Sequence, residues 1–278
     1  DADDSSCVEP HGLEMTGDRA ARNVGAFALG YCIFACSFFF LHHKPFDRFE
    51  GKGYLRKIMP AGLYDQLDPV TQADMASRGH SALHAVLVWG HLFAMSHCDI
   101  WWKPLANQCA ASEFFFGITV GYFAFDFAVV LDYRMPFWQV FVVHHIAAIS
   151  PYFINNYVPG ASACHFVLGL FIQVEIATLV LNYQNYLEVT EQSHSERYAR
   201  VFYGAYALWF VVRIILPFYI AYLLIADVMP VYGASPKLFV AYCCAFFIVL
   251  FCFVVFAFVM TPDVLNHWRG PAAATGKG

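Results

Sequence analysis

The sequence predicts an all-α fold, a polytopic membrane helix bundle with about seven transmembrane helices. Of its 278 residues, 59% are hydrophobic and only 13% are charged, whereas soluble domains carry about 25% charged residues. Seven apolar runs follow one another along the chain, and each is close to the roughly 17 to 25 residues that a spanning helix needs. The chain shows no internal repeat and no second domain.

The apolar runs define the expected spans, with a polar, acidic segment at 1–23 before them and a tail at 261–278 after them. We place the spans at residues 24–41, 81–97, 113–131, 137–153, 161–181, 199–226 and 237–260. The sixth run is long enough to tilt or protrude. A single transmembrane domain therefore covers 24–260.

The long connection at 42–80 mixes charged residues with Pro and Gly. Its Tyr54, Leu55 and Ile58 suit a short interfacial helix at the level of the lipid headgroups. An ordinary solvated loop fits the same residues.

The distribution of Lys and Arg predicts an orientation. With seven spans, the loops on the N-terminal side hold four basic residues and those on the other side hold eleven. Basic residues collect on the inner side, so we expect the N-terminus outside or lumenal and the C-terminus inside. Cys98 and Cys109 flank a polar loop on the outer side, where a disulfide can form, but spacing alone leaves their pairing open.

Ionisable residues lie inside three neighbouring runs. The fourth run, FWQVFVVHHIAAISPYF, carries His144 and His145, while Asp126 lies in the third and Glu175 in the fifth. At about 1.5 Å per residue, these groups lie roughly 8 to 10 Å from the inner ends of their helices. Because ionisable groups are costly in the membrane and mark functional sites there, we predict one shared polar pocket. The alternative is that they are structural polar contacts between helices, worth about 1 kcal/mol each.

Other polar residues share the expected inward faces by helical spacing. They are Tyr122, Thr178, Asn182, His84 and Arg213. On the second span, His84 also shares its face with His80 and His91. Arg213 is deep in the sixth run, and we expect it to pair with Glu175 or Asp126.

The order of these motifs resembles the TLC domain family, named for TRAM, Lag1 and CLN8. The likeness covers residues 78–260 and rests on SALHA, GYFAFD, VVHHIAAI, EIAT and VVRIILP. It is closest to the small TLC-domain-containing proteins rather than the ceramide synthases. The resemblance implies a helix bundle around an elongated pocket for a lipid acyl chain. We expect the endoplasmic reticulum or another endomembrane, with the mitochondrial inner membrane as the alternative.

The ceramide synthases use their His pair in acyl transfer from acyl-CoA to an amine. The resemblance carries this catalytic role onto His144 and His145, with Asp126 holding one imidazole. The fifth run departs from the synthases, because it reads CHFVLGLFIQVEIATLVLN and lacks their HD acidic motif. We therefore expect the protein to bind or handle a lipid. Whether it also transfers an acyl group stays open. Acyl-CoA would be a co-substrate, and we expect no resident cofactor or metal.

The sequence also bears on other classes of function. A catalytically silent accessory subunit of a larger membrane complex stays open, because the seventh run is apolar on all sides and must face lipid or neighbouring protein. A di-iron hydroxylase is disfavoured, since Phe141 interrupts an HxxHH box. A retinal protein would need a lysine in the middle of the seventh run, which has none. The net charge of -5 argues against nucleic-acid binding.

Overall fold

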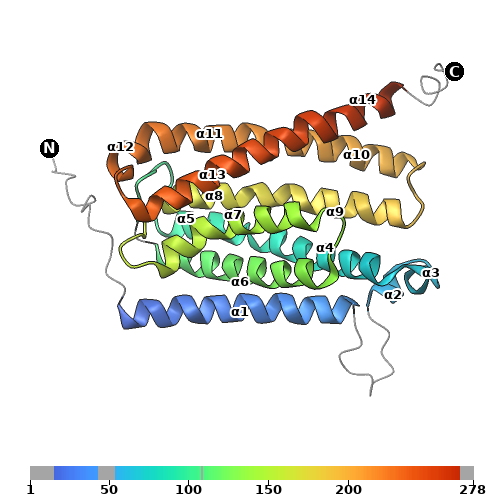
Figure 1. Cartoon of the computed structure of the whole chain (residues 1–278), viewed down its shortest axis with the longest axis horizontal. Helices are drawn as coiled ribbons and strands as arrows, with labels where there is room; N and C mark the ends of the chain where they lie inside the picture. Colours follow the sequence, from blue (N-terminus) through green and yellow to red (C-terminus); the bar gives the residue numbers. More distant parts are fainter. Residues whose placement is uncertain (1–15, 43–53, 108, 270–278) are drawn as a thin grey trace.

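The computed structural model describes residues 16–42, 54–107 and 109–269, and these residues form helices and connecting turns without a strand. Long helices lie side by side along the longest axis of the molecule, which is horizontal in Figure 1. The predicted all-α bundle is therefore confirmed.

The described residues form these successive elements along the chain. The first half contains α1 (Gly17–His42), α2 (Leu55–Ile58), α3 (Leu63–Gln66), α4 (Pro69–Leu87), α5 (Gly90–His97), α6 (Ala110–Tyr133) and α7 (Trp138–Tyr157). The second half contains α8 (His165–Ile172), η3 (Gln173–Glu175), α9 (Ile176–Val189), α10 (Glu196–Trp209), η4 (Phe210–Ile215), α11 (Leu216–Leu223), η5 (Leu224–Val228), α12 (Met229–Tyr232), α13 (Pro236–Val255), η6 (Phe256–Met260) and α14 (Thr261–Arg269).

Five continuous helices in the described parts are long and apolar enough to cross a membrane. They are Gly17–His42, Ala110–Tyr133, His165–Val189, Glu196–Tyr232 and Pro236–Arg269. The other two expected spans correspond to α4 with α5 and to α7, which carry more polar residues. An exact count of seven spans stays a prediction.

The second span begins earlier than its apolar run suggests. Its helix starts at Pro69, inside the connection expected at 42–80, because Asp68 caps it: the carboxylate accepts hydrogen bonds from the backbone N–H groups of Val70 and Thr71. The hydrogen bond from the Thr71 hydroxyl holds the pKa of Asp68 below its ordinary value. Pro at the first helical position is typical of a helix start.

The expected interfacial element is partly present. The helix α2 covers Leu55–Ile58, where Leu55 is buried and both Tyr54 and Ile58 are exposed. The rest of that connection, 43–53, lies outside the described residues. The same holds for residues 1–15 of the expected N-terminal segment and 270–278 of the expected tail. Of the remaining residues, 17–23 and 261–269 are helical.

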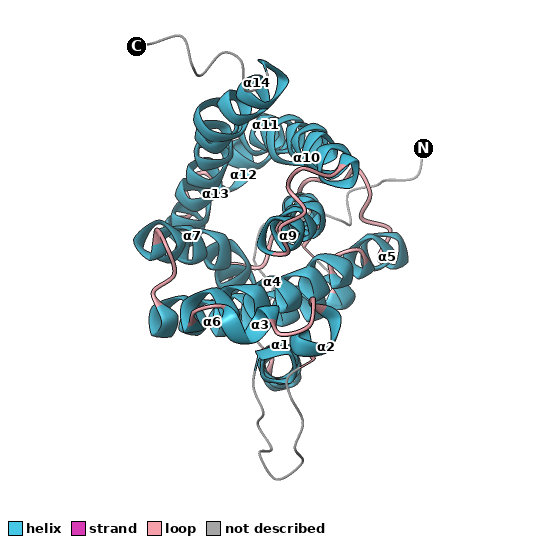
Figure 2. Ribbon diagram, turned by 90° about the vertical axis from the view of Figure 1, so that its right-hand side faces the viewer, coloured by secondary structure: helices cyan, strands magenta, loops and turns pink. Residues whose placement is uncertain are grey.

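The helix α1 lies at one edge of the bundle, and α10, α11 and α14 lie at the opposite edge (Figure 2). Where α1 contacts α6, the two backbones approach each other closely. A Cβ added to Gly121 would lie 2.5 Å from the Phe27 carbonyl oxygen, and one on Gly30 would lie 2.5 Å from that of Ile118. Small residues permit such close approach of membrane helices.

An ion cluster around the buried Glu113 carboxylate fixes the first two turns of α1 to the start of α6. The Glu113 carboxylate lies 2.8 Å from the Arg19 guanidinium and 2.5 Å from that of Arg22. Asn156 of α7 donates a hydrogen bond of 2.7 Å to the Glu113 carbonyl oxygen. These contacts hold the ends of α1, α6 and α7 in register.

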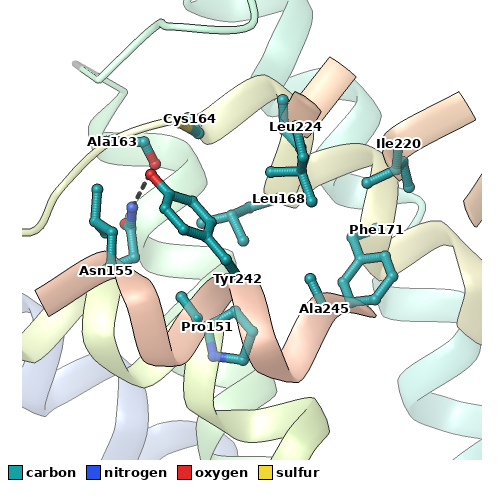
Figure 3. A pocket seen from close by; sticks show the side chains of 13 residues that line it. Pro151, Asn155, Ala163, Cys164, Leu168, Phe171, Ile220, Leu224, Tyr242 and Ala245 are labelled. Carbon is teal, nitrogen blue, oxygen red and sulfur yellow. Dashed lines mark hydrogen bonds between the residues drawn. The ribbon is translucent and has the colours of Figure 1, made fainter. Parts of the chain in front are cut away.

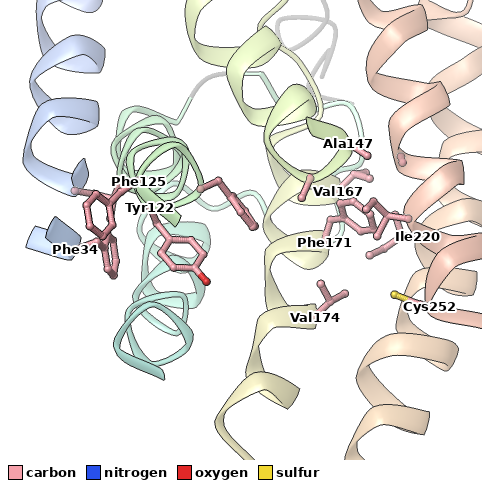
Figure 4. Close-up of a cluster of buried hydrophobic side chains, with 14 of the residues drawn as sticks. Phe34, Tyr122, Phe125, Ala147, Val167, Phe171, Val174, Ile220 and Cys252 are labelled. Atoms are coloured by element: carbon pink, nitrogen blue, oxygen red, sulfur yellow. The ribbon is translucent and has the colours of Figure 1, made fainter. Parts of the chain in front are cut away.

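The apolar core extends from α1 and α6 to α8, α11 and α13. Phe34 and Phe125 mark one side, and Phe171 and Ile220 mark the other (Figure 4). The polar side chains predicted to form a site lie between these two sides.

Candidate functional site

One buried carboxylate joins three helices. Asp126 on α6 accepts a hydrogen bond of 2.7 Å from the Ser77 hydroxyl through Oδ1, which also lies 2.9 Å from His80 Nε2. Its Oδ2 lies 2.6 Å from His145 Nε2. Ser77 and His80 belong to α4, and His145 belongs to α7. We call these four residues the Asp126 cluster.

The hydrogen bonds of His145 occupy both of its ring nitrogens. Nδ1 lies 2.7 Å from the Phe141 carbonyl oxygen, which can only accept, so Nδ1 carries a hydrogen. Nε2 faces Asp126 Oδ2. One proton lies between these two atoms and is bonded to one of them, so neither atom is free. With 5% of its surface exposed, His145 has no nitrogen available for a substrate.

His144 faces a different part of the bundle. Its ring centroid lies 5.1 Å from that of Phe251 on α13, and its plane is almost perpendicular to that of His145. Adjacent residues of a helix point about 100° apart, so the two imidazoles serve different surroundings. Among the described residues, the buried His144 Nδ1 has no hydrogen-bond partner.

A second polar group lies on the opposite side of His144. The Arg213 guanidinium lies 3.4 Å from Glu175 Oε1 and donates hydrogen bonds of 3.0 Å to the Val174 carbonyl and 3.1 Å to the Thr178 hydroxyl. The guanidinium also lies 4.7 Å from the centroid of the Trp209 ring. Of the two carboxylates expected as partners of Arg213, Glu175 and Asp126, the structure pairs it with Glu175.

Both members of this Glu175–Arg213 pair come from distorted helix turns. Glu175 ends the 3₁₀ turn η3, and Arg213 lies in the π-helical turn η4. Turns of these kinds inside long helices are often found at functional sites.

A polar pocket lies between the pair and His144. The cavity has about 330 Å³ of empty space, and His144, Glu175 and Arg213 line it together with Tyr152 and with apolar side chains that include Phe171. The pocket is therefore lined by one imidazole that has a nitrogen without a hydrogen-bond partner among the described residues, and by one ion pair whose opposite charges balance.

An apolar pocket adjoins the polar pocket, and Phe171 lines both. It has about 490 Å³ of empty space between α7, α8, α11 and α13 (Figure 3). Its walls include Leu168, Ile220 and Ala245. From Phe171 it extends toward the start of α8, the end of the bundle that the charge distribution predicts to be outer.

The structure divides the predicted site residues into groups. Asp126 and His145 form one, and His144, Glu175, Arg213 and Thr178 form the other, with the two imidazole rings 5.7 Å apart between them.

Three further predicted residues have other surroundings. Tyr122 stacks on His84 at 3.9 Å between ring centroids, and His84 Nε2 lies 3.2 Å from the Thr119 hydroxyl. Asn182 lines neither pocket and donates a hydrogen bond of 2.8 Å to the Arg78 carbonyl, which ties α9 to α4.

Sequence reasoning did not assign Ser77 or His80 to the site, although both hold Asp126. The available signal was the HxxxH spacing of His80 and His84, which puts a second imidazole one turn from a predicted site residue.

The structure bonds Cys98 to Cys109, with their Cα atoms 5.6 Å apart. This settles the pairing that spacing left open and closes the loop between α5 and α6. Within residues 16–42, 54–107 and 109–269, no three His, Cys, Asp or Glu side chains are grouped to hold a metal ion.

Apolar spans around a buried polar centre define an integral membrane helix bundle. The TLC domain, the domain of TRAM, LAG1 and CLN8, matches residues 74–261. This is more than half of the chain, which therefore belongs to the TLC domain family. Comparison with curated proteins and with solved structures finds no match. The matched range begins inside α4, so α1 lies outside it although α1 packs directly on α6.

Proposed function

We propose that this protein binds a membrane lipid inside the bundle, with an acyl or alkyl chain in the apolar pocket. The observation that carries this proposal is the apolar cavity of about 490 Å³ that adjoins a polar cavity of about 330 Å³ at Phe171. Ligand pockets combine apolar walls with a few polar groups that fix the orientation of the ligand. We also propose that the protein resides in an endomembrane or in the mitochondrial inner membrane and takes its lipid from there.

The surrounding bilayer determines which interactions can contribute free energy to lipid binding. Lipid tails are as apolar as Leu, so a chain gains little hydrophobic free energy when it leaves the bilayer for the pocket. Affinity must then come from close packing and from hydrogen bonds to polar groups. Hydrogen bonds to the His144 imidazole, and to the few polar atoms among the mostly apolar lining of the other pocket, would therefore decide which lipid binds.

Acyl transfer is a second candidate, and the unpartnered Nδ1 of His144 favours it. His145 already uses both nitrogens, and Asp126 holds His145 rather than His144. If the protein transfers an acyl group from acyl-CoA, His144 would be the general base, and Asp126 would act by positioning the helix that carries it.

A silent accessory role is the third candidate. The most apolar window of Pro236–Arg269 is only 17% buried within the chain. Its outer face would contact lipid or neighbouring subunits of a membrane complex.

The test of lipid binding is co-isolation. The chain is purified in mild detergent, and bound lipid is measured by native mass spectrometry for the wild type, Ala245→Trp and Leu250→Trp. Ala245 lines the apolar pocket and is buried, whereas Leu250 on the same helix is 60% exposed. We expect lipid on the wild type and Leu250→Trp but not on Ala245→Trp. Equal lipid on both variants contradicts the proposal.

Turnover separates the remaining candidates. If the protein consumes acyl-CoA, His144→Ala should abolish the reaction while His194→Ala, a change in a polar connection, leaves it unchanged. A native mass that includes other subunits, with no bound lipid and no turnover, would favour the accessory role.

A further inference from the structure

The outer end of the apolar pocket carries two polar atoms without partners. The Tyr242 hydroxyl and Asn155 Oδ1 are both buried and make no hydrogen bond with the described residues. The exposed fractions of these residues are 7% and 3%, and both residues line the pocket. Figure 3 shows the Tyr242 ring reaching toward the Asn155 amide.

The orientation of the Asn155 amide is fixed by its other atom. Nδ2 donates a hydrogen bond of 2.7 Å to the Ala163 carbonyl oxygen. A carbonyl only accepts, so Nδ2 must keep this place and Oδ1 remains the free atom. The pocket therefore offers one acceptor, Oδ1, and one hydroxyl that donates or accepts. Buried polar groups in native proteins are almost always satisfied, which points to a ligand or solvent group at this position.

We propose that the apolar pocket binds a neutral lipid with a hydroxyl group, whose chain lies between α8, α11 and α13 and whose hydroxyl meets Tyr242 and Asn155. The lipid hydroxyl donates to Asn155 Oδ1 and accepts from the Tyr242 hydroxyl. This inference rests on the proposed function and names the lipid class. It places the hydroxyl away from His144, so a lipid in this orientation is bound rather than acylated.

The chemistry of the lining disfavours charged lipids. A carboxylate cannot donate to Asn155 Oδ1, and none of the described residues that line this pocket is Lys, Arg, Asp or Glu. The nearby ammonium of Lys237 donates a hydrogen bond of 2.6 Å to the Pro159 carbonyl, outside the lining. A buried charge without a partner is costly, so fatty acids and long-chain amines fit less well than an alcohol.

The lining matches a lipid with one apolar chain and one hydroxyl. Apart from Tyr242 and Asn155, the residues that line the pocket are apolar, and the two polar atoms without partners lie at one end. The hydroxyl could belong to a free long-chain alcohol or to the glycerol of a monoacyl lipid, and both have the same chemistry at this end.

The experiment compares probes that differ only at the polar end. Isotope-labelled tetradecan-1-ol, tetradecane, tetradecanoate and 1-tetradecanoylglycerol are titrated into the full chain in detergent micelles, and bound probe is counted. Each net hydrogen bond changes affinity by roughly fivefold, so the alcohol should bind about 25-fold more tightly than the alkane. Tetradecanoate should bind no better than the alkane. Tighter binding of the glycerol ester than of the alcohol would assign the hydroxyl to a lipid headgroup.

The matched variants remove single hydroxyl groups. Tyr242→Phe should weaken binding of the alcohol about fivefold and leave the alkane unchanged, while Tyr232→Phe, which lies outside the pocket lining, should change neither. Equal affinity for alcohol and alkane in the wild type overturns the inference but leaves lipid binding standing. Failure of all four probes to bind overturns the proposed function as well. If Tyr242→Phe does not fold, the wild-type probe series decides alone.

Discussion

Removal of the Asp126 carboxylate should destabilise the bundle strongly, because this group joins three helices. The carboxylate accepts from Ser77 and faces both His80 and His145 at 2.6 to 2.9 Å. Hydrogen bonds to charged groups contribute about 1.5 to 3 kcal/mol each. Loss of the two imidazole contacts in Asp126→Ala should therefore lower the free energy of unfolding by about 3 to 6 kcal/mol.

Asp126→Asn should cost about half as much, because its amide can replace part of the network. The amide oxygen can still accept from Ser77 and His80, and the amide N–H can donate to Nε2 of a neutral His145. That tautomer keeps the hydrogen on Nδ1 for the Phe141 carbonyl. The order of stabilities, wild type above Asn above Ala, follows from hydrogen-bond capacity and not from side-chain volume.

The assay is equilibrium unfolding in mixed micelles with increasing denaturing detergent, followed by the near-ultraviolet signal of the aromatic residues. Asp132→Ala is the control, because Asp132 is exposed on the same helix, and exposed changes usually stay within about 0.5 kcal/mol. If Asp126→Ala and Asp132→Ala unfold at the same detergent fraction, the Asp126 cluster does not hold the three helices together.

Three further changes test other parts of the structure. Gly121→Leu should displace α1 and cost about 1 to 3 kcal/mol, which the same unfolding assay measures; unchanged stability would contradict the backbone contact. Arg213→Met should cost about 3 to 5 kcal/mol because it leaves Glu175 buried without a cation, and adding Glu175→Gln should recover part of that loss; no recovery in this double variant would refute the pairing. The pKa of Asp68 is lowered in the folded state, so its contribution is present above the ordinary value of 3.8 and is lost as pH falls through the folded value. Wild type should lose more stability than Asp68→Asn between about pH 5 and pH 3, the range just around an ordinary Asp pKa, and parallel curves would exclude the cap as the cause.

The membrane bundle and much of its polar centre follow from the sequence because burying charge in hydrocarbon leaves few solutions. The common depth of Asp126, His144 and Glu175 predicted one shared pocket, and the isolated Arg213 required a carboxylate; the structure pairs Arg213 with Glu175 beside His144 but puts Asp126 in a separate group with His145. Both expectations depend only on helical rise and on the cost of an unpaired charge. The structure adds that the two histidines separate, since neighbouring helical residues cannot face one site.

Other features depend on how helices rotate about their axes, which one sequence does not reveal. His80 and Ser77 reach Asp126 only because α4 turns that face toward α6. Asp68 followed by Pro69 is an N-cap signature that predicts the start of α4. The expected span was placed by its apolar run instead, and that run begins later in the sequence. The apolar pocket with Tyr242 and Asn155 combines elements distant in sequence, and only their packing brings those residues together.

The most direct test of lipid binding inside the bundle is photolabelling with site mapping. A single-chain lipid with a photoreactive group on its chain is incubated with the full-length protein, irradiated, and mapped by mass spectrometry. If lipid binds inside the bundle, labels should fall on the pocket-lining residues Val167, Phe171 and Ala245, and unlabelled tetradecan-1-ol should compete with them. Labels confined to the exposed, outward-facing residues Val240, Phe247 and Leu250, with no competition, would show that lipid only surrounds the protein and would contradict the account.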